Sequence, residues 1–235
     1  MDYIKAVAAA PAGWRHFGID DLDRLPQAVK SHSLASLPPN ELQLVESREQ
    51  DAVERVLRAL FWTLVYHLES DRWDQLARIE PIHPGIVAAL PASVDTGLDV
   101  GAGSGRLTQH LAPRSRQLVA IEPSAGLGLI LRSRLPEVGV VAGWAEALPI
   151  PDGWSSLTAA CGAFGPEPAV LRELRRVTRP GGVIFLVSPE EPDWFEANGW
   201  RRLTMAPIPA LDREAWIDDF FGPPHPPHEL VMTQV

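Results

Sequence analysis

Three alternating glycines and a later acid are the residues of this chain best suited to hold a ligand. Gly101, Gly103 and Gly105 lie in the stretch DVGAGSG, which follows a short apolar run and precedes a helix-like segment. Glycines in such a turn let a ligand approach bare backbone N–H groups. Glu122 ends the next apolar run, and an acid at the tip of that strand is suited to a ribose diol. The pattern predicts a site for a cofactor that contains a nucleoside.

The spacing of the glycines separates the candidate cofactors. A dinucleotide fingerprint reads G-x-G-x-x-G, whereas this loop reads G-x-G-x-G and has Arg106 where the third glycine would allow close helix–strand contact. A P-loop is excluded because no Gly-Lys-Ser/Thr follows. With Asp99 in front of it, the loop resembles motif I of the class I S-adenosylmethionine (SAM)-dependent methyltransferases.

Three later segments resemble further motifs of the same family, in the same order. Val119–Ser124 resembles the second strand with its ribose-binding acid, and Gly143–Gly153 resembles the loop after the third strand. Leu171–Gly182 resembles the helix and turn before the fifth strand. The similarity extends over residues 94–190 and is greatest to small-molecule methyltransferases of the ubiquinone/menaquinone-biosynthesis type.

The resemblance implies SAM as the cofactor and a role for each matching residue. The backbone from Gly101 to Gly103 is expected to face the methionyl part and the ribose, and Glu122 to accept both ribose hydroxyls. Asp99 is expected to brace the loop or to contact the amino-acid end through water. The full set of expected cofactor-binding residues is Asp99, Gly101, Ala102, Gly103, Gly105, Glu122, Pro123, Trp144, Ala145, Glu146 and Cys161.

Two of these positions have alternative interpretations. Trp144 occupies the place of an Asp that meets the adenine amine in the family, and it is expected either to stack on the adenine or to pack in the core. The Ala145 N–H and the Glu146 carboxylate are alternative adenine contacts. Cys161 ends the fourth strand, where the family shapes its pocket, and is expected to be a small buried hydrophobe rather than a nucleophile.

Few residues are candidates for the chemical step itself. Methyl transfer from a sulfonium needs alignment above all, and a base is used only with some nucleophiles. His83, in the sequence EPIHP, is the candidate base, and its alternative role is to hold a turn. No metal is expected, because His225 and His228 lack further ligands nearby in the sequence.

The elements that position these residues alternate between strands and helices. Strands are expected at about 96–100, 117–121, 138–142, 156–161 and 182–187, and helices near 105–112, 124–134 and 167–178. Two antiparallel strands, Trp200–Met205 and Leu230–Val235, are expected to end the sheet, with a helix over Leu211–Phe221 between them. This order predicts an α/β, Rossmann-like class I methyltransferase fold, with a mostly parallel seven-stranded sheet and helices on both faces.

The N-terminal part of the chain has a different character. Residues 1–45 show no persistent period and are expected to form an irregular arm whose apolar side chains pack on the domain. One long helix is expected over Ser47–Leu68, followed by another over Asp71–Ile79. The resemblance implies a helical lid, so residues 1–93 are expected to be arm and lid, and residues 94–235 the SAM-binding core.

Charge and cysteine content restrict the partners and the compartment. The net charge of −9 and the absence of a Lys/Arg cluster argue against nucleic acid and anionic membranes. Cys161 is the only cysteine, no apolar run is long enough to span a membrane and no segment resembles a signal peptide, so a cytoplasmic location is expected. The residues carry no signal for an oligomeric state.

The function predicted from these observations is methyl transfer from SAM to a small molecule. Aromatic residues of the arm and lid, among them Trp62, Tyr66 and Trp73, favour an apolar or aromatic acceptor. Two alternatives stay open. The first is a methyltransferase-like binding or scaffold protein without transfer activity, for which Trp144 in place of the usual Asp would be the sign. The second is an NAD(P)-dependent oxidoreductase, and Arg106 in place of the third glycine argues against it.

Overall fold

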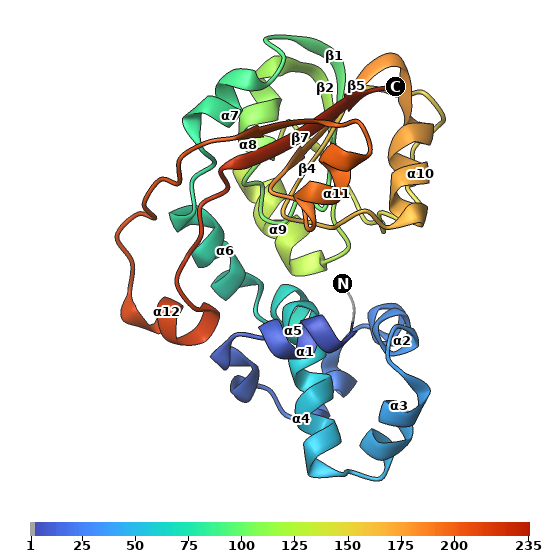
Figure 1. Cartoon of the computed structure of the whole chain (residues 1–235), viewed down its shortest axis with the longest axis vertical. Coiled ribbons are helices and arrows are strands. Elements are labelled where there is room, and N and C mark those ends of the chain that lie inside the picture. The colour runs from blue at the N-terminus through green and yellow to red at the C-terminus, as the bar shows by residue number, and fades with distance from the viewer. Residues whose placement is uncertain (1–2) are drawn as a thin grey trace. The chain divides into compact units, whose positions relative to one another are not determined.

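The chain folds into two compact units, which are described one at a time (Figure 1). The computed structural model describes residues 3–235, apart from the side chains of Val45 and Glu46. The sheet unit contains residues 77–211 and 225–235, and the helical unit contains the described residues up to 76 together with 212–224. The expected boundary between residues 93 and 94 stays a prediction about where the SAM-binding core begins.

A seven-stranded sheet in the order β3-β2-β1-β4-β5-β7-β6 forms the centre of the sheet unit. β1 to β5 run parallel, and β7 pairs antiparallel with both β5 and β6. The strands are β1 Val94–Val100, β2 Ser115–Ile121, β3 Gly139–Val141, β4 Ser155–Cys161, β5 Thr178–Val187, β6 Arg201–Thr204 and β7 Glu229–Gln234. The predicted mostly parallel, Rossmann-like class I fold is therefore confirmed. The strand order reverses beside β1, and ligands of such sheets bind at the carboxyl ends of the strands at that point.

Helices cover both faces of this sheet, because alternate residues of each buried strand point to opposite sides. In β5, Phe185 lies in one apolar layer with α7 to α9, and Leu186 lies in the other with α10 and α11. The helices are α7 Pro84–Ala89, α8 Thr108–Leu111, α9 Ala125–Arg134, α10 Pro168–Val177 and α11 Pro192–Ala197, and a 3-10 turn, η3, spans Ala112–Arg114.

One helix of the sheet unit is shorter than predicted. The helix expected near 105–112 begins only at Thr108. Gly103 and Gly105 have φ angles of +57° and +102°, so the chain leaves the right-handed helical region until the glycines have passed. The glycines that predicted the loop therefore also delay the helix.

The helical unit corrects the prediction of an irregular arm. Residues 3–46 form three short helices and two 3-10 turns, and prolines stand before or at the start of three of these five elements. Helices of this length complete too few turns for a lasting period to show in the sequence. The apolar side chains of the arm are buried, among them Trp14, Phe17 and Leu22, and their packing on the SAM-binding domain stays a prediction. The elements are α1 Tyr3–Ala9, η1 Ala12–His16, η2 Ile19–Arg24, α2 Gln27–Ala35, α3 Pro39–Glu46, α4 Gln50–Ala59, α5 Phe61–Leu68 and α12 Ala215–Phe221. α6 Ser70–Ile79 begins in this unit, and its last three residues belong to the sheet unit.

The single long helix expected over Ser47–Leu68 is also wrong. It is divided into α4 and α5 at Leu60, whose φ and ψ are −97° and 8°. After this break Phe61 is fully buried, with ring centroids 6.2 Å from Phe17 and 5.6 Å from Phe220. Trp62 packs beside Tyr66 and Trp73 with centroid distances of 6.0 and 5.7 Å. Tertiary packing of aromatic rings accompanies the break at a position where no proline or glycine predicts one.

The other predicted elements hold with smaller changes. α6 confirms the helix expected at Asp71–Ile79, whereas α12 begins at Ala215 instead of Leu211. No helix within residues 3–235 combines the length and the apolar character needed to cross a bilayer.

Candidate cofactor site

The glycine loop lies between β1 and α8, at the carboxyl edge of the sheet. Gly101, Gly103 and Gly105 all have positive φ angles, of +68°, +57° and +102°. The N–H groups of Gly101 and Ala102 donate to the Ile121 carbonyl at 2.9 and 3.0 Å, which ties the loop to the end of β2. A Cβ on Gly101 would lie 2.9 Å from the Cβ of Ala163. Both the backbone angle and the space therefore require glycine at residue 101.

The Glu122 carboxylate lies directly across this loop. The Gly103 N–H donates to Glu122 Oε2 at 2.7 Å, and the Ser124 N–H donates to Oε1 at 2.8 Å. Burial raises the pKa of Glu122, and these two N–H groups act against that rise. Each carboxylate oxygen has a second lone pair, so both can accept a ligand hydroxyl as well. The structure thus brings together the loop and the acid that the sequence singled out.

Asp99 lies beneath the loop as a fully buried carboxylate. The Thr108 hydroxyl donates to Asp99 Oδ2 at 2.6 Å, whereas Oδ1 has no hydrogen-bond partner among the residues described. Burial raises the pKa of Asp99 to about 7, the Thr108 bond lowers it, and the charge of Glu122 raises it further. A buried oxygen left without a donor requires an explanation, and the ammonium of a ligand such as SAM fits it.

The other expected cofactor residues follow β2, β3 and β4 at the same edge. The Glu122 N–H donates to the Val141 carbonyl at 3.1 Å, which holds the end of β3 beside Glu122 and Pro123. Trp144, three residues further on, forms a bridge with Ala147 and is half-buried. Next to it, the half-buried Ala145 precedes the exposed Glu146. Their adenine contacts stay predictions.

Cys161 ends β4 and is half-buried. Burial raises the pKa of its thiol, so the thiolate that a nucleophile needs is disfavoured at neutral pH. This agrees with the expectation of a small apolar side chain at that position.

Comparison with known proteins agrees with the geometry. A methyltransferase domain family matches residues 98–182, from the end of β1 into β5. The chain is 37% identical over 100 residues to an uncharacterized methyltransferase of Mycobacterium tuberculosis, covering 42% of this chain and 41% of that protein. It is 37% identical over 105 residues to the demethylmenaquinone methyltransferase of Beutenbergia cavernae, covering 43% and 44%. Residues 98–182 of the chain therefore resemble a methyltransferase domain.

A solved structure supports the fold of this chain. A chain of the complex that contains the Haloferax volcanii Trm112 methyltransferase activator superimposes with a TM-score of 0.51 at 17% identity, covering 71% of this chain and 94% of that chain. The chain spans less than half the length of the curated relatives named above.

The candidate base His83 serves as the N-cap of α7. Its Nδ1 accepts a hydrogen bond from the Gly85 backbone N–H at 3.0 Å, and the backbone N–H of His83 donates to the Pro227 carbonyl at 2.9 Å. In a neutral imidazole the accepting nitrogen carries the lone pair, so the proton lies on Nε2. The Nδ1 lone pair, which His83 would need to accept a proton as a base, is therefore already engaged with the Gly85 N–H. A catalytic role for His83 stays a prediction, and the observed contact is the turn-holding alternative.

We find no candidate metal site in the part of the chain that the structure describes. Within residues 3–235, no three His, Cys, Asp or Glu side chains form a group that could hold an ion.

Arg106 and Glu80 are the residues at this edge that the site prediction omitted. The Arg106 Nη1 donates to Glu80 Oε2 at 2.6 Å, and both side chains are mostly buried, at 13% and 11% exposure. Two sequence features could have predicted this ion pair. They are a cation directly after the last glycine of the loop and an acid shortly before the first strand.

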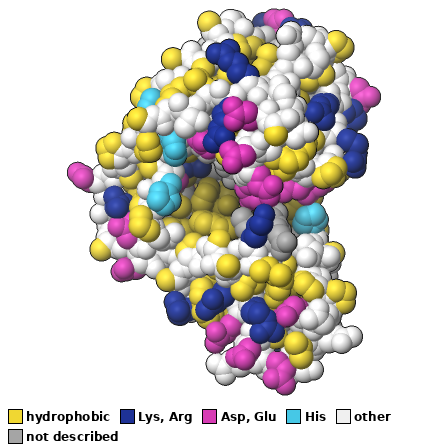
Figure 2. All heavy atoms as spheres, viewed as in Figure 1, with side chains coloured by type: hydrophobic (Ala, Val, Ile, Leu, Met, Phe, Trp, Pro, Cys, Tyr) yellow, Lys and Arg dark blue, Asp and Glu magenta, His cyan; other side chains and the backbone are white. Residues whose placement is uncertain are grey.

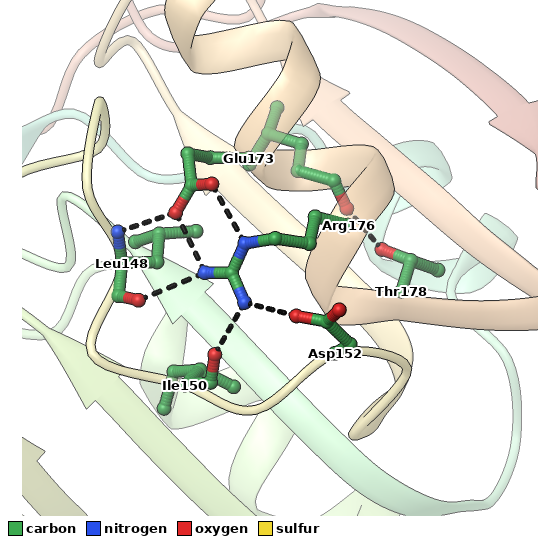
Figure 3. Close-up of polar contacts among 7 residues, drawn as sticks. Leu148, Ile150, Asp152, Glu173, Arg176 and Thr178 are labelled. Carbon is green, nitrogen blue, oxygen red and sulfur yellow. Dashed lines mark hydrogen bonds and ion pairs between the residues drawn. The ribbon is translucent and has the colours of Figure 1, made fainter.

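Arg176 of α10 holds the loop that follows Trp144–Glu146 (Figure 3). It donates to the Leu148 and Ile150 carbonyls at 2.9 and 2.8 Å and to Asp152 at 2.7 Å. Glu173 binds two of its nitrogens at 2.7 Å and also accepts from the Leu148 N–H at 2.7 Å. One guanidinium thus ties the loop to the helix with charge-assisted hydrogen bonds.

Replacing Arg176 by alanine should destabilise the protein by about 2 kcal/mol, because several hydrogen bonds to one charged group are lost at a partly exposed site. Urea unfolding followed by tryptophan fluorescence measures the change. The matched control is Arg175→Ala, since the neighbouring Arg175 side chain is exposed. Equal stability of the two variants would contradict the assigned role of Arg176.

Proposed function

We propose that this methyltransferase binds SAM in the glycine loop and transfers its methyl group to a small-molecule acceptor. The observation that carries the proposal is the 2.7 Å hydrogen bond from the Gly103 N–H to Glu122, which holds a buried carboxylate across bare backbone. A carboxylate in that position suits a ribose diol, and the neighbouring backbone can be approached closely.

Each part of the cofactor is matched by a group of this edge. Glu122 accepts the ribose hydroxyls, the backbone of Gly101 to Gly103 lies along the methionyl part, and Asp99 Oδ1 accepts from the ammonium. Gly105 allows the turn, and Cys161 lines the methionyl end. Pro123, Trp144, Ala145 and Glu146 surround the adenine in this proposal.

When bound, SAM supplies a methyl group that its sulfonium makes electrophilic. The chain's own contribution is alignment and exclusion of water, which a displacement of this kind needs most. His83 is the only side chain that we carry forward as a candidate base, and the cap on α7 would have to open for it to accept a proton.

The acceptor is proposed to be neutral or cationic rather than a polyanion. The chain has a net charge of −9, and the face in Figure 2 carries its Lys and Arg side chains in scattered small groups among acidic ones. A nucleic-acid surface would require a continuous basic stripe. A single cysteine is compatible with a reducing compartment, so we place the reaction in the cytoplasm.

Isothermal titration of the full chain with S-adenosylhomocysteine tests the proposal. Binding with a Kd on the order of 10 μM is expected, within the usual range for enzyme ligands. NADH serves as the comparison ligand and should produce no heat of binding. Absence of S-adenosylhomocysteine binding at about 1 mM, a free energy weaker than about 4 kcal/mol, would reject the cofactor assignment.

A further inference from the structure

Trp194 is a large aromatic side chain that the fold leaves open to solvent, with 37% of its surface exposed. The next residue of α11, Phe195, is fully buried in the apolar layer that contains α10, and its ring centroid lies 4.9 Å from that of Trp200. The Trp194 ring meets Phe195 edge-on, with centroids 5.3 Å apart. Exposure of a single apolar side chain is ordinary by itself. The position of Trp194 in the fold therefore decides what its exposure means.

The turn between β5 and α11 has an unusual backbone. Ser188 and Glu191 have φ angles of +42° and +54°, although neither is a glycine. The left-handed conformation costs free energy at such residues, and it is found most often where a functional site needs a fixed geometry. The Ser188 N–H donates to the Glu229 carbonyl at 2.9 Å, and the Glu190 N–H donates to the Phe164 carbonyl at 3.2 Å. The turn is thus tied to β7 on one side and to the loop after β4 on the other.

Arg202 holds the start of α11 at the same edge of the sheet. Its Nη1 donates to Asp193 Oδ1 at 2.5 Å, and its Nη2 donates to Glu229 Oε1 at 2.7 Å. Glu229 begins β7 beside the carboxyl end of β5, because the next residue pairs with Val187, the last residue of β5. Since β1, β4 and β5 are parallel, this is also the edge that carries the glycine loop. Trp194, which follows Asp193, therefore lies at the carboxyl edge of the sheet.

The order of the strands relates Trp194 to the proposed cofactor site. In the proposed function, the nucleoside lies at the ends of β1 and β2, and the methionyl end reaches Cys161 at the end of β4. β5 follows β4 on the side away from β1. The ends of β4 and β5 are joined by a hydrogen bond of 2.9 Å from the Gly162 N–H to the Val187 carbonyl. Because the cofactor occupies the β1 side, a molecule that receives the methyl group beside Cys161 would extend over the end of β5, toward Trp194.

We propose that Trp194 is a specificity-determining residue that contacts the methyl acceptor, and that the acceptor is an uncharged planar aromatic molecule. The inference rests on the proposed function and narrows its acceptor class. The flat face of an indole packs against an aromatic ring more favourably than against a saturated ring of the same size. The indole N–H is also a donor for an oxygen carried by that ring. The net charge of −9 disfavours an anionic acceptor.

The test uses two probes that differ only in aromaticity, 2-naphthol and decahydro-2-naphthol. Each is titrated by calorimetry into the full chain after saturation with S-adenosylhomocysteine, which keeps the probes out of the nucleoside site. The wild type should bind 2-naphthol about 3- to 10-fold more tightly than the saturated probe, the range for a favourable pair of aromatic rings. General hydrophobic binding would favour the saturated probe or neither. This comparison needs no variant.

Variants of Trp194 assign the preference to this side chain. Trp194→Ala should weaken 2-naphthol binding by about 10-fold or more and abolish the preference for the aromatic probe. Trp194→Phe keeps a ring but loses the N–H donor, so the preference should remain and the affinity should fall by about 3-fold. Both variants should bind S-adenosylhomocysteine like the wild type. The matched control is Leu129→Ala, which removes an apolar side chain of α9 that is 63% exposed and should change none of these affinities.

Each other outcome has a defined meaning. Equal affinities of the two probes for the wild type, or no 2-naphthol binding at about 1 mM, would overturn the proposed acceptor class. An unchanged preference in Trp194→Ala would overturn the role of Trp194. Weaker S-adenosylhomocysteine binding in both Trp194 variants would show that the side chain supports the edge of the sheet, which also overturns the inference. If the wild type does not bind S-adenosylhomocysteine, the proposed function itself fails, and this result is distinct from the others.

Discussion

Glu122→Ala should lower the affinity for S-adenosylhomocysteine by about 100-fold or more. The substitution removes the two acceptors that we propose for the ribose hydroxyls, and each hydrogen bond to a charged group contributes about 1.5–3 kcal/mol. It also leaves the N–H groups of Gly103 and Ser124 without the carboxylate that holds them at 2.7 and 2.8 Å. Loss of ligand contacts and loss of loop order therefore act in the same direction. Titration calorimetry and ligand-induced thermal shift measure the effect.

Glu137→Ala provides the matched control for Glu122, because Glu137 is an exposed acid of the same unit. It should bind S-adenosylhomocysteine like the wild type. Glu122→Gln removes the charge of the side chain but keeps its shape. The amide oxygen can still accept from one of the two backbone N–H groups, whereas the amide NH2 would face the other N–H group, donor against donor. We therefore expect an affinity between those of the wild type and Glu122→Ala. Wild-type affinity in Glu122→Ala would remove the observation on which the proposed function depends.

Asp99→Asn should stabilise the ligand-free protein at pH 8 while weakening cofactor binding. Burial raises the pKa of Asp99 from 3.8 to about 7, opposed by the Thr108 hydrogen bond and assisted by the Glu122 charge. The folded state therefore retains a proton that the unfolded state loses between about pH 4 and pH 7. The stability contributed by Asp99 is fully present below pH 4 and is lost as the pH rises through 7, by about 4 kcal/mol.

An asparagine resembles the protonated acid at every pH, so this loss should be absent in the variant. The unfolding free energies of wild type and Asp99→Asn should be similar near pH 4 and should differ by several kcal/mol near pH 8. Chemical denaturation across this range measures the difference, with Asp219→Asn as the control at an exposed acid. Parallel pH profiles for Asp99→Asn and the wild type would contradict the assignment.

The same substitution should reduce S-adenosylhomocysteine affinity by about 10-fold, because a neutral amide replaces the anion that faces the ligand ammonium. Proton release offers a second readout in the wild type. If the ammonium favours the ionised carboxylate, binding near pH 6.5 should release protons, as revealed by titrations in buffers of different ionisation enthalpy. Asp99→Asn should bind without this release. A gain in stability combined with a loss in binding would mark Asp99 as a residue retained for function.

The sequence by itself determined the order of the sheet elements and the pairing of the glycine loop with Glu122. Both depend on local patterns: strand–helix alternation predicts a parallel sheet, and the carboxyl ends of its neighbouring strands meet at one edge. Glu122 follows β2 directly, and β2 pairs with β1 in register. No knowledge of distant contacts was needed to bring the carboxylate to the loop.

Only the tertiary structure decided which side chains meet across long stretches of the chain. Glu80 contacts both Arg106 and His225, which follow it by 26 and 145 residues in the sequence. A local hydrophobic period does not encode the rotamer that brings a long arginine side chain to such a partner. The break at Leu60 and the short helices of the arm likewise depend on what packs against them. Periodic patterns report which face of an element is buried, whereas the identity of the partner on that face is set by the folded chain as a whole.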